Sequence, residues 1–186
     1  MNPTTYWIGG GSVSNRSLLI VGAGIYGAVA SEIAIDMGCF TKIDFLDDNR
    51  NVTANNQKVI GTISELEKFT DLYTDVIVAI GDAKTRVSLL DKIEKNLPYR
   101  LPVLISPKSY VSPSAQVGAG SVIEPMAVVH TGVILEKGCL ISAGAVVNHL
   151  AICQAGVHVD CNATVMGSAV VPGCHIVECG TVYGKQ

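Results

Sequence analysis

The 186-residue sequence has little charge and few aromatic side chains: charged residues make up 16% of it, and Phe, Trp and Tyr together 5%, whereas 48% is hydrophobic. This apolar composition predicts extensive buried surface, or a surface covered by subunit contacts. The net charge of −3 provides no basic footprint for nucleic acid, so no nucleic-acid partner is expected.

Long apolar runs are also missing. No segment reaches the roughly 18 consecutive apolar residues of a membrane helix, and no membrane span is expected. Residues 1–17 lack the charged start and apolar stretch of a signal peptide, and their Gly9-Gly10-Gly11 predicts a flexible lead-in. The protein is therefore expected in the cytoplasm.

No pair of cysteines is spaced as C-x-x-C. Without a secretory signal a disulfide framework is not expected, and no tight Cys/His cluster indicates zinc. We interpret the cysteines as small apolar core residues and expect no metal. They are Cys39, Cys139, Cys153, Cys161, Cys174 and Cys179.

What the sequence does contain is a repeat. From Val111 it reads as twelve hexapeptides without insertion: VSPSAQ, VGAGSV, IEPMAV, VHTGVI, LEKGCL, ISAGAV, VNHLAI, CQAGVH, VDCNAT, VMGSAV, VPGCHI and VECGTV. Position one is Val, Ile or Leu in all but the hexapeptide of Cys153, and position five is mostly small. Period six matches neither the helical nor the strand periodicity, and predicts short strands turning at regular corners.

This repeat resembles that of the hexapeptide-repeat transferases. The resemblance implies a left-handed parallel β-helix with three hexapeptides per coil, so the twelve make four coils over residues 106–186. Stacked coils need caps, because an open end exposes unpaired strand edges. The sequence stops at Tyr183-Gly184-Lys185-Gln186, so the β-helix is expected to be short and to lack an obvious cap.

The first half alternates strands with helices. Strands are predicted at 18–21, 43–46, 75–80 and 103–105, and helices at 28–37, 64–69 and 86–96. This order is typical of an α/β domain with a parallel sheet. We predict a Rossmann-like domain over residues 18–105, joined to the C-terminal left-handed parallel β-helix.

A glycine-rich loop follows the first strand. Gly22-Ala23-Gly24-Ile25-Tyr26-Gly27 matches G-x-G-x-x-G between a strand and a helix, a pattern that brings backbone N–H groups close to a phosphate. Asp47 and Asp48 end the next strand, where a dinucleotide fold places its ribose-binding acid. A domain this short fits a mononucleotide-binding half better than a full dinucleotide fold.

A Rossmann-like domain leading directly into hexapeptide repeats resembles the NeuD/PglD type of sugar O- and N-acetyltransferase over residues 18–184. The resemblance implies a nucleotide-sugar or sugar-acid substrate, held by Gly22, Gly24, Tyr26, Gly27, Asp47, Asp48 and Gly81. The family usually carries a histidine where Tyr26 stands. The resemblance also implies a homotrimer, with the active site between neighbouring chains.

The resemblance further implies the acyl-transfer residues. His149 matches the family's general base, and an imidazole titrates near neutrality, as such a base requires. For acetyl-CoA, the co-substrate, it implies contacts with His158, Gly167 and Cys179. The family's acidic residue after the base is replaced by Leu150, which is expected to weaken it. His130 and His175 lie outside the motif and are interpreted as structural.

Together these features predict acetyl-CoA-dependent acetylation of an amino or hydroxyl group of a nucleotide-activated or sialic-acid-like sugar. A serine-type O-acetyltransferase is disfavoured by the nucleotide-binding half. A second class is a non-catalytic, trimeric sugar-nucleotide-binding partner of a sugar-biosynthesis enzyme, a degenerate acetyltransferase. A third is a fragment of an NAD-dependent oxidoreductase, although no substrate domain follows.

Overall fold

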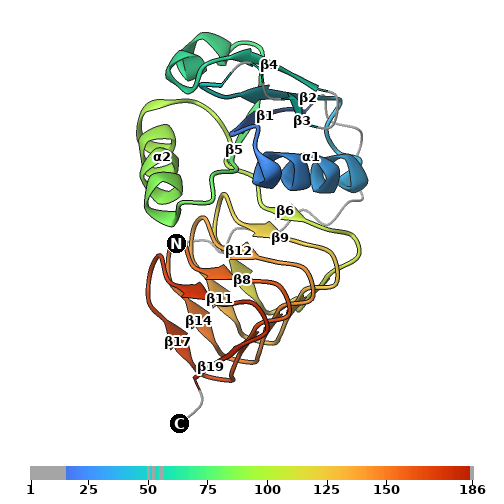
Figure 1. Ribbon diagram of the computed structural model, residues 1–186, viewed down its shortest axis with the longest axis vertical. Helices are drawn as coiled ribbons and strands as arrows, with labels where there is room; N and C mark the ends of the chain where they lie inside the picture. The colour runs from blue at the N-terminus through green and yellow to red at the C-terminus, as the bar shows by residue number, and fades with distance from the viewer. Residues whose placement is uncertain (1–15, 50, 52, 55–56, 185–186) are drawn as a thin grey trace.

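The computed structural model describes residues 16–49, 51, 53–54 and 57–184. Residues 1–15 of the expected lead-in, residues 1–17, lie outside the described residues. Ser17 is already the first residue of a strand. Figure 1 shows an α/β part at one end of the molecule and a stack of triangular coils running away from it.

The α/β part is built on a five-stranded sheet in the order β3-β4-β2-β1-β5. Only the β3–β4 pair is antiparallel. The edge strand β3 and its neighbour β4 were not predicted, because their short sequences TA and QKVIG carry no clear apolar run. The strands are β1 (Ser17–Val21), β2 (Lys42–Leu46), β3 (Thr53–Ala54), β4 (Gln57–Gly61) and β5 (Asp75–Val78).

Helices cover both faces of this sheet. Leu18 and Ile20 of β1 point into the core shared with α1 (Ile25–Met37), while Leu19 and Val21 point into the core shared with α2 (Ala83–Asn96). The 3₁₀ helix η1 (Ile63–Phe69) lies on the α2 side. Both α-helices begin three residues before the predicted starts, directly after the carboxyl ends of β1 and β5.

The second part is a left-handed parallel β-helix of two-residue strands in three sheets. Each strand pairs with the strand 18 residues away, as Val128 does with Val146, so three hexapeptides form one coil. The β6 sheet contains β6 (Leu104–Ile105), β9 (Val122–Ile123), β12 (Leu140–Ile141), β15 (His158–Val159) and β18 (Ile176–Val177). The β7 sheet contains β7 (Tyr110–Val111), β10 (Val128–Val129), β13 (Val146–Val147), β16 (Thr164–Val165) and β19 (Val182–Tyr183). The β8 sheet contains β8 (Gln116–Val117), β11 (Ile134–Leu135), β14 (Ile152–Cys153) and β17 (Val170–Val171).

The strand predicted at 103–105 does not join the first sheet. β6 pairs in parallel with β9 and so is the first strand of the β-helix. The sequence ISPKSY, residues 105–110, is a further hexapeptide in the same register, with its aliphatic residue at position one. The repeat therefore begins one hexapeptide before Val111.

Most corners of the β-helix contain a residue with positive φ. From Gly120 to Gly180 it is always position four of the hexapeptide, and in about half of them it is not glycine. The non-glycine residues are Met126, Leu150, Asn162, Ser168 and Cys174. The left-handed conformation costs a residue with a Cβ atom, such as Leu150, roughly 1 kcal/mol relative to glycine, so Leu150 occupies a strained corner at φ 59°.

The two parts are packed against each other through α1. In Figure 1 this helix lies between the parallel sheet and the first strands of the β6 sheet. Leu104, Val122 and Leu140 project from the outer face of the β6 sheet into the same core as Ile33 and Ala34 of α1. The β6 sheet is therefore the face of the β-helix that the α/β part covers.

Candidate functional site

The glycine loop follows β1 at the carboxyl edge of the parallel sheet. Gly22 has φ 104°, and a Cβ there would lie 2.7 Å from the carbonyl oxygen of Ala79. A Cβ at Gly27 would collide with the carbonyl oxygen of Gly22. At Gly24, by contrast, no atom of the described residues lies within 4 Å of an added Cβ. The loop is therefore closed against the protein at both ends and open at Gly24, the residue that precedes α1.

The two acids after β2 are both engaged with backbone N–H groups. Asp47 accepts from the N–H of Ala23 at 2.7 Å and from that of Asn49 at 2.8 Å. Asp48 accepts from the N–H of Ile63 at 3.1 Å. Asp47 therefore holds the glycine loop in place, and Asp48 ties the end of β2 to the start of η1.

A groove of about 360 Å³ separates η1 from α2. Asp48 lies on it, and Val21, Leu66, Leu89 and Ile93 provide its apolar walls. Of the predicted substrate-binding residues, Asp48 is the one that lines this groove.

Tyr26 connects the glycine loop to the β-helix. Its Cε2 atom lies 3.1 Å from the position of a Cβ on Gly81, so the missing side chain at Gly81 leaves room for the ring. On its other side the Tyr26 ring meets the His158 ring edge-on, with centroids 5.8 Å apart. Residues from the first turn of α1, from the loop after β5 and from β15 are thus brought together.

His158 is 5% exposed and lies in a hydrogen-bonded chain. Ser142 Oγ donates to Glu124 at 3.4 Å and is hydrogen-bonded to His158 Nε2 at 2.9 Å. Burial lowers the pKa of His158, against the opposing effect of Asp160, whose carboxylate lies 3.8 Å away. Burial also raises the pKa of the Glu124 carboxyl group, which accepts from the N–H of Ala143.

His149 lies at a different place on the β-helix. It follows β13 and precedes β14, so it occupies the corner between the β7 and β8 sheets, where it is exposed. Asn148 Oδ1 lies 2.8 Å from both the backbone nitrogen and the Nδ1 atom of His149. A Cβ on Gly167, one coil later, would lie 2.7 Å from Nε2, so the ring rests over a bare glycine.

Leu150 turns away from this ring. Its Cδ2 atom lies 2.8 Å from the position of a Cβ on Gly132, which belongs to the coil before. His149 leans towards the coil after. The side chains of the two neighbours therefore diverge along the β-helix axis.

One chain does not assemble all the predicted site residues. The corner that holds His149 and Gly167 is opposite the β6 sheet in the triangular cross-section, whereas Tyr26 and His158 lie over that sheet. Cys179 is exposed at a corner that follows β18. His175 packs against Tyr183, with ring centroids 5.3 Å apart, and His130 is exposed.

Several residues of the site were not predicted. One column along the β-helix contains Glu124, Ser142 and Asp160. Their spacing of 18 residues, which is one coil, is a signal that the sequence contains. Asn148 directly precedes His149, although nothing in the sequence shows where its amide points. Arg86 of α2 donates a hydrogen bond to the carbonyl oxygen of Gly156 in the β-helix. This contact depends on how the two parts pack and had no sequence signal.

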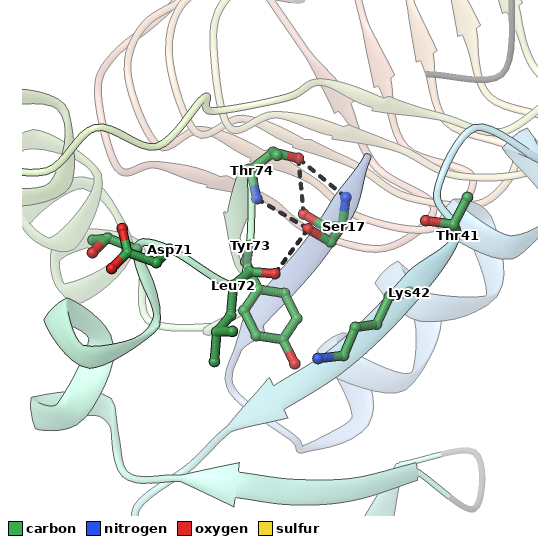
Figure 2. Close-up of a pocket in the computed structure, with 8 residues that line it drawn as sticks. Ser17, Thr41, Lys42, Asp71, Leu72, Tyr73 and Thr74 are labelled. Carbon is green, nitrogen blue, oxygen red and sulfur yellow. Dashed lines mark hydrogen bonds between the residues drawn. The ribbon is translucent and has the colours of Figure 1, made fainter. Parts of the chain in front are cut away.

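A second hollow, of about 350 Å³, lies at the opposite edge of the parallel sheet. Figure 2 shows Ser17 and Thr74 joined there by reciprocal hydrogen bonds, with Lys42 beside Tyr73. The Lys42 ammonium lies 4.3 Å from the centre of the Tyr73 ring. This hollow is separate from the glycine loop, which lies at the carboxyl ends of the strands.

Comparison with known proteins is consistent with this arrangement. The PglD N-terminal domain family matches residues 17–93. The acetyltransferase domain of PglB from Neisseria gonorrhoeae, solved in complex with acetyl coenzyme A, is 34% identical, with a TM-score of 0.86 over 91% of this chain and 82% of that one. The chain belongs to the NeuD/PglD-type sugar acetyltransferases.

Solved structures of lower sequence identity share the fold. A histidine-to-asparagine variant of perosamine N-acetyltransferase from Caulobacter crescentus, in complex with CoA and GDP-perosamine, is 21% identical with a TM-score of 0.74, covering 91% of this chain and 89% of that one. WeeI from Acinetobacter baumannii is 17% identical with a TM-score of 0.58, covering 90% and 88%. No curated protein matches the chain significantly.

Within the described residues, no three His, Cys, Asp or Glu side chains are grouped to hold a metal ion. None of the helices described is both long and apolar enough to cross a membrane.

Proposed function

We propose that the protein transfers an acetyl group from acetyl-CoA to an amino or hydroxyl group of a nucleotide-linked or sialic-acid-like sugar, with His149 as the general base. The observation that carries this proposal is the exposed ring of His149. Asn148 holds this ring, and the Nε2 atom of His149 lies over Gly167. The 34% identity to an acetyltransferase domain that binds acetyl coenzyme A supports the donor.

The nucleotide-sugar is held, in this proposal, at the carboxyl edge of the parallel sheet. Backbone N–H groups at the start of α1 face the opening at Gly24 and suit a diphosphate. Gly22 and Gly27 shape the loop, Gly81 admits the Tyr26 ring, and the acids at 47 and 48 hold the edge in place. The sugar then extends towards Tyr26 and the β-helix.

Acetyl-CoA binds between the β-helices of two chains, in this proposal, with Gly167 of the chain that supplies the base and His158 and Cys179 of its neighbour on its path. Nε2 of His149 removes the proton from the attacking amine or hydroxyl as that atom bonds to the thioester carbonyl carbon. Backbone N–H groups suit the oxyanion that forms. When the carbon–sulfur bond breaks, the acetyl group stays on the sugar and CoA leaves as the thiol, taking a proton.

The site is completed, we propose, between the chains of a homotrimer. His149 occupies the corner opposite the face that carries Tyr26 and His158, so one chain cannot bring both to one substrate. Apolar residues on the uncovered sheets suit subunit contact: Tyr110 is 56%, Val170 51% and Val182 44% exposed. A neighbouring chain would then supply the base.

The reaction is expected in the cytoplasm. All six cysteines, each within the described residues, carry free thiols. Free thiols support a reducing compartment.

The test is acetyl transfer by wild type and by His149→Ala, with acetyl-CoA and a panel of UDP-, GDP- and CMP-linked amino and hydroxyl sugars. Loss of the base should lower kcat by about 10²–10⁴-fold. The circular dichroism spectrum should not change, because the ring is exposed. A variant with the wild-type rate would overturn the assignment of His149.

A second candidate is a non-catalytic sugar-nucleotide-binding partner. The observation that favours it is Leu150, which stands where the family has an acid and whose side chain is turned towards Gly132. Tight binding of a sugar nucleotide without turnover would support this function. Steady transfer of acetyl groups would exclude it.

A further inference from the structure

The amide of Asn148 can have only one orientation. Its Oδ1 atom lies 2.8 Å from the backbone nitrogen of His149. That nitrogen always carries a hydrogen, so the side-chain atom facing it must be the oxygen acceptor.

This orientation determines the tautomer of the neutral His149 ring. The same oxygen lies 2.8 Å from Nδ1 of His149. An oxygen acceptor requires Nδ1 to donate, so the proton of the neutral ring is on Nδ1 and the lone pair on Nε2. Nε2 is the atom over Gly167, on the side where the next coil begins.

The neighbouring position cannot easily provide the same contact. Residue 150 has φ 59° and its side chain packs towards the coil that precedes His149, over Gly132. The ring leans towards the coil that follows. The chain therefore orients its histidine from the residue before it, with a neutral acceptor.

Resting on the proposed role of His149, we propose that Asn148 is a positioning residue, which fixes the Nδ1–H tautomer and the ring orientation through its Oδ1 atom and so presents the Nε2 lone pair to the acceptor substrate. A neutral amide orients the ring without adding the charge by which a carboxylate stabilises the imidazolium. The base is thus aligned by an amide, and its own hexapeptide, VNHLAI, contains no acid.

The first measurement needs no substrate. In full-length protein with ¹⁵N-labelled histidine, at a pH where the ring is neutral, the resonances lost in His149→Ala identify the His149 ring. Wild type should show a protonated Nδ1 and an unprotonated Nε2. Asn148→Leu, which has a similar shape and no acceptor, should lose this preference, and Asn148→Asp should keep it. Wild type with its proton on Nε2, or an unchanged tautomer in Asn148→Leu, would overturn the proposal.

The second measurement is the pH–rate profile. Asn148→Leu should lower kcat by up to about 10²-fold, the effect of a misplaced reacting group. Asn148→Asp should restore the rate and move the acidic limb to higher pH, because a carboxylate favours the imidazolium. Thr131→Ala, an exposed position at the same corner one coil earlier, is the matched control and should behave as wild type. Equal rates and profiles in all four proteins would count against a positioning role.

The two proposals can fail separately. If His149→Ala keeps full activity while wild type shows the Nδ1–H tautomer that Asn148→Leu loses, His149 is not the base and the Asn148 contact stands. If His149→Ala is inactive while Asn148→Leu keeps both its tautomer and its rate, the base is confirmed and the positioning role is rejected.

Discussion

Arg86 donates a hydrogen bond to the carbonyl oxygen of Gly156, 70 residues later in the sequence, at 2.9 Å. Arg86 belongs to α2, and Gly156 to a corner of the β-helix. The same fully buried guanidinium donates to the carbonyls of Gly138, Ile80 and Gly81. One side chain therefore joins the end of β5, next to the glycine loop, to two successive coils.

Replacing Arg86 with methionine should destabilise the junction between the two parts. The carbonyl oxygens would lose buried donors, and each unsatisfied buried group costs about 1–3 kcal/mol. We expect the free energy of unfolding, from urea denaturation, to fall by at least about 3 kcal/mol. Lys84→Met, an exposed position on the same helix, should change it little. Equal stability of the two variants would show that Arg86 does not hold the parts together.

Gly24→Val should abolish nucleotide-sugar binding and keep the fold. The added side chain meets no described atom within 4 Å, so it should extend into the space expected for the phosphates. Acetyl-CoA binding, measured by calorimetry, should be unchanged.

Gly27→Ala is the contrasting variant, because its Cβ would collide with the carbonyl of Gly22. It should lower the melting temperature and weaken both ligands through the fold. If Gly24→Val loses acetyl-CoA as well, the two-site arrangement is wrong.

The β-helix could be predicted from the repeat, because position one of nearly every hexapeptide is an aliphatic residue that must point inwards. Val129, Ile141 and Val159 all do so and are fully buried. The glycine loop was equally readable, since strand, glycines and helix follow in order. β6 was assigned to the wrong sheet because a short apolar strand fits either part, and only its pairing with β9 decides.

Contacts between distant segments could not be predicted in this way. The Tyr26–His158 contact and the four carbonyl partners of Arg86 depend on how α1 and α2 pack on the β6 sheet. Asp47 was expected to bind ribose, and its bond to the N–H of Ala23 depends on a loop conformation that no pattern encodes. The proposed roles of the predicted site residues stay predictions.

Acid should weaken the fold partly through His158. Burial lowers its pKa, with Asp160 opposing and Arg86 adding to the effect; Tyr26 and, through Ser142, Glu124 also face it. The unfolded chain protonates this histidine near its ordinary value of about 6.5. It therefore binds more protons than the folded protein just below that pH, and stability falls as the pH drops from about 6.5 to the lowered pKa.

Glu124 contributes with the opposite sign. Its pKa is raised by burial, so stability falls as the pH rises from its ordinary value, near 4.5, to the raised one. The contribution of His158 is measured by urea denaturation of wild type and of His158→Gln between about pH 7.5 and pH 5.5. This range extends about one unit either side of 6.5. The variant should lose less stability on acidification. When the measurement is extended down to pH 4.5, the ordinary pKa of the Glu124 carboxyl group, Glu124→Gln should lose more stability than wild type. Parallel curves for wild type and His158→Gln would show that His158 does not contribute.

The proposed trimer can be tested through its active site. Sedimentation at micromolar concentration should give three chains, and a stable monomer would contradict the shared site. A sharper experiment co-expresses two inactive variants, His149→Ala and Gly24→Val. Because the proposed site takes its glycine loop from one chain and its base from the next, mixed trimers contain some sites with both parts intact. Random mixing of equal amounts gives about a quarter of the sites in this form.

The co-expressed variants should therefore recover about a quarter of the wild-type kcat per site, while each variant alone stays inactive. If loop and base instead act within one chain, every chain carries a defect and no activity returns. Co-expression of His149→Ala with the double variant Gly24→Val/His149→Ala is the control, since no chain then supplies a base. Activity in this control would rule out His149 as the shared residue, and its absence, together with recovery in the first mixture, would place His149 and the glycine loop of one working site on different chains.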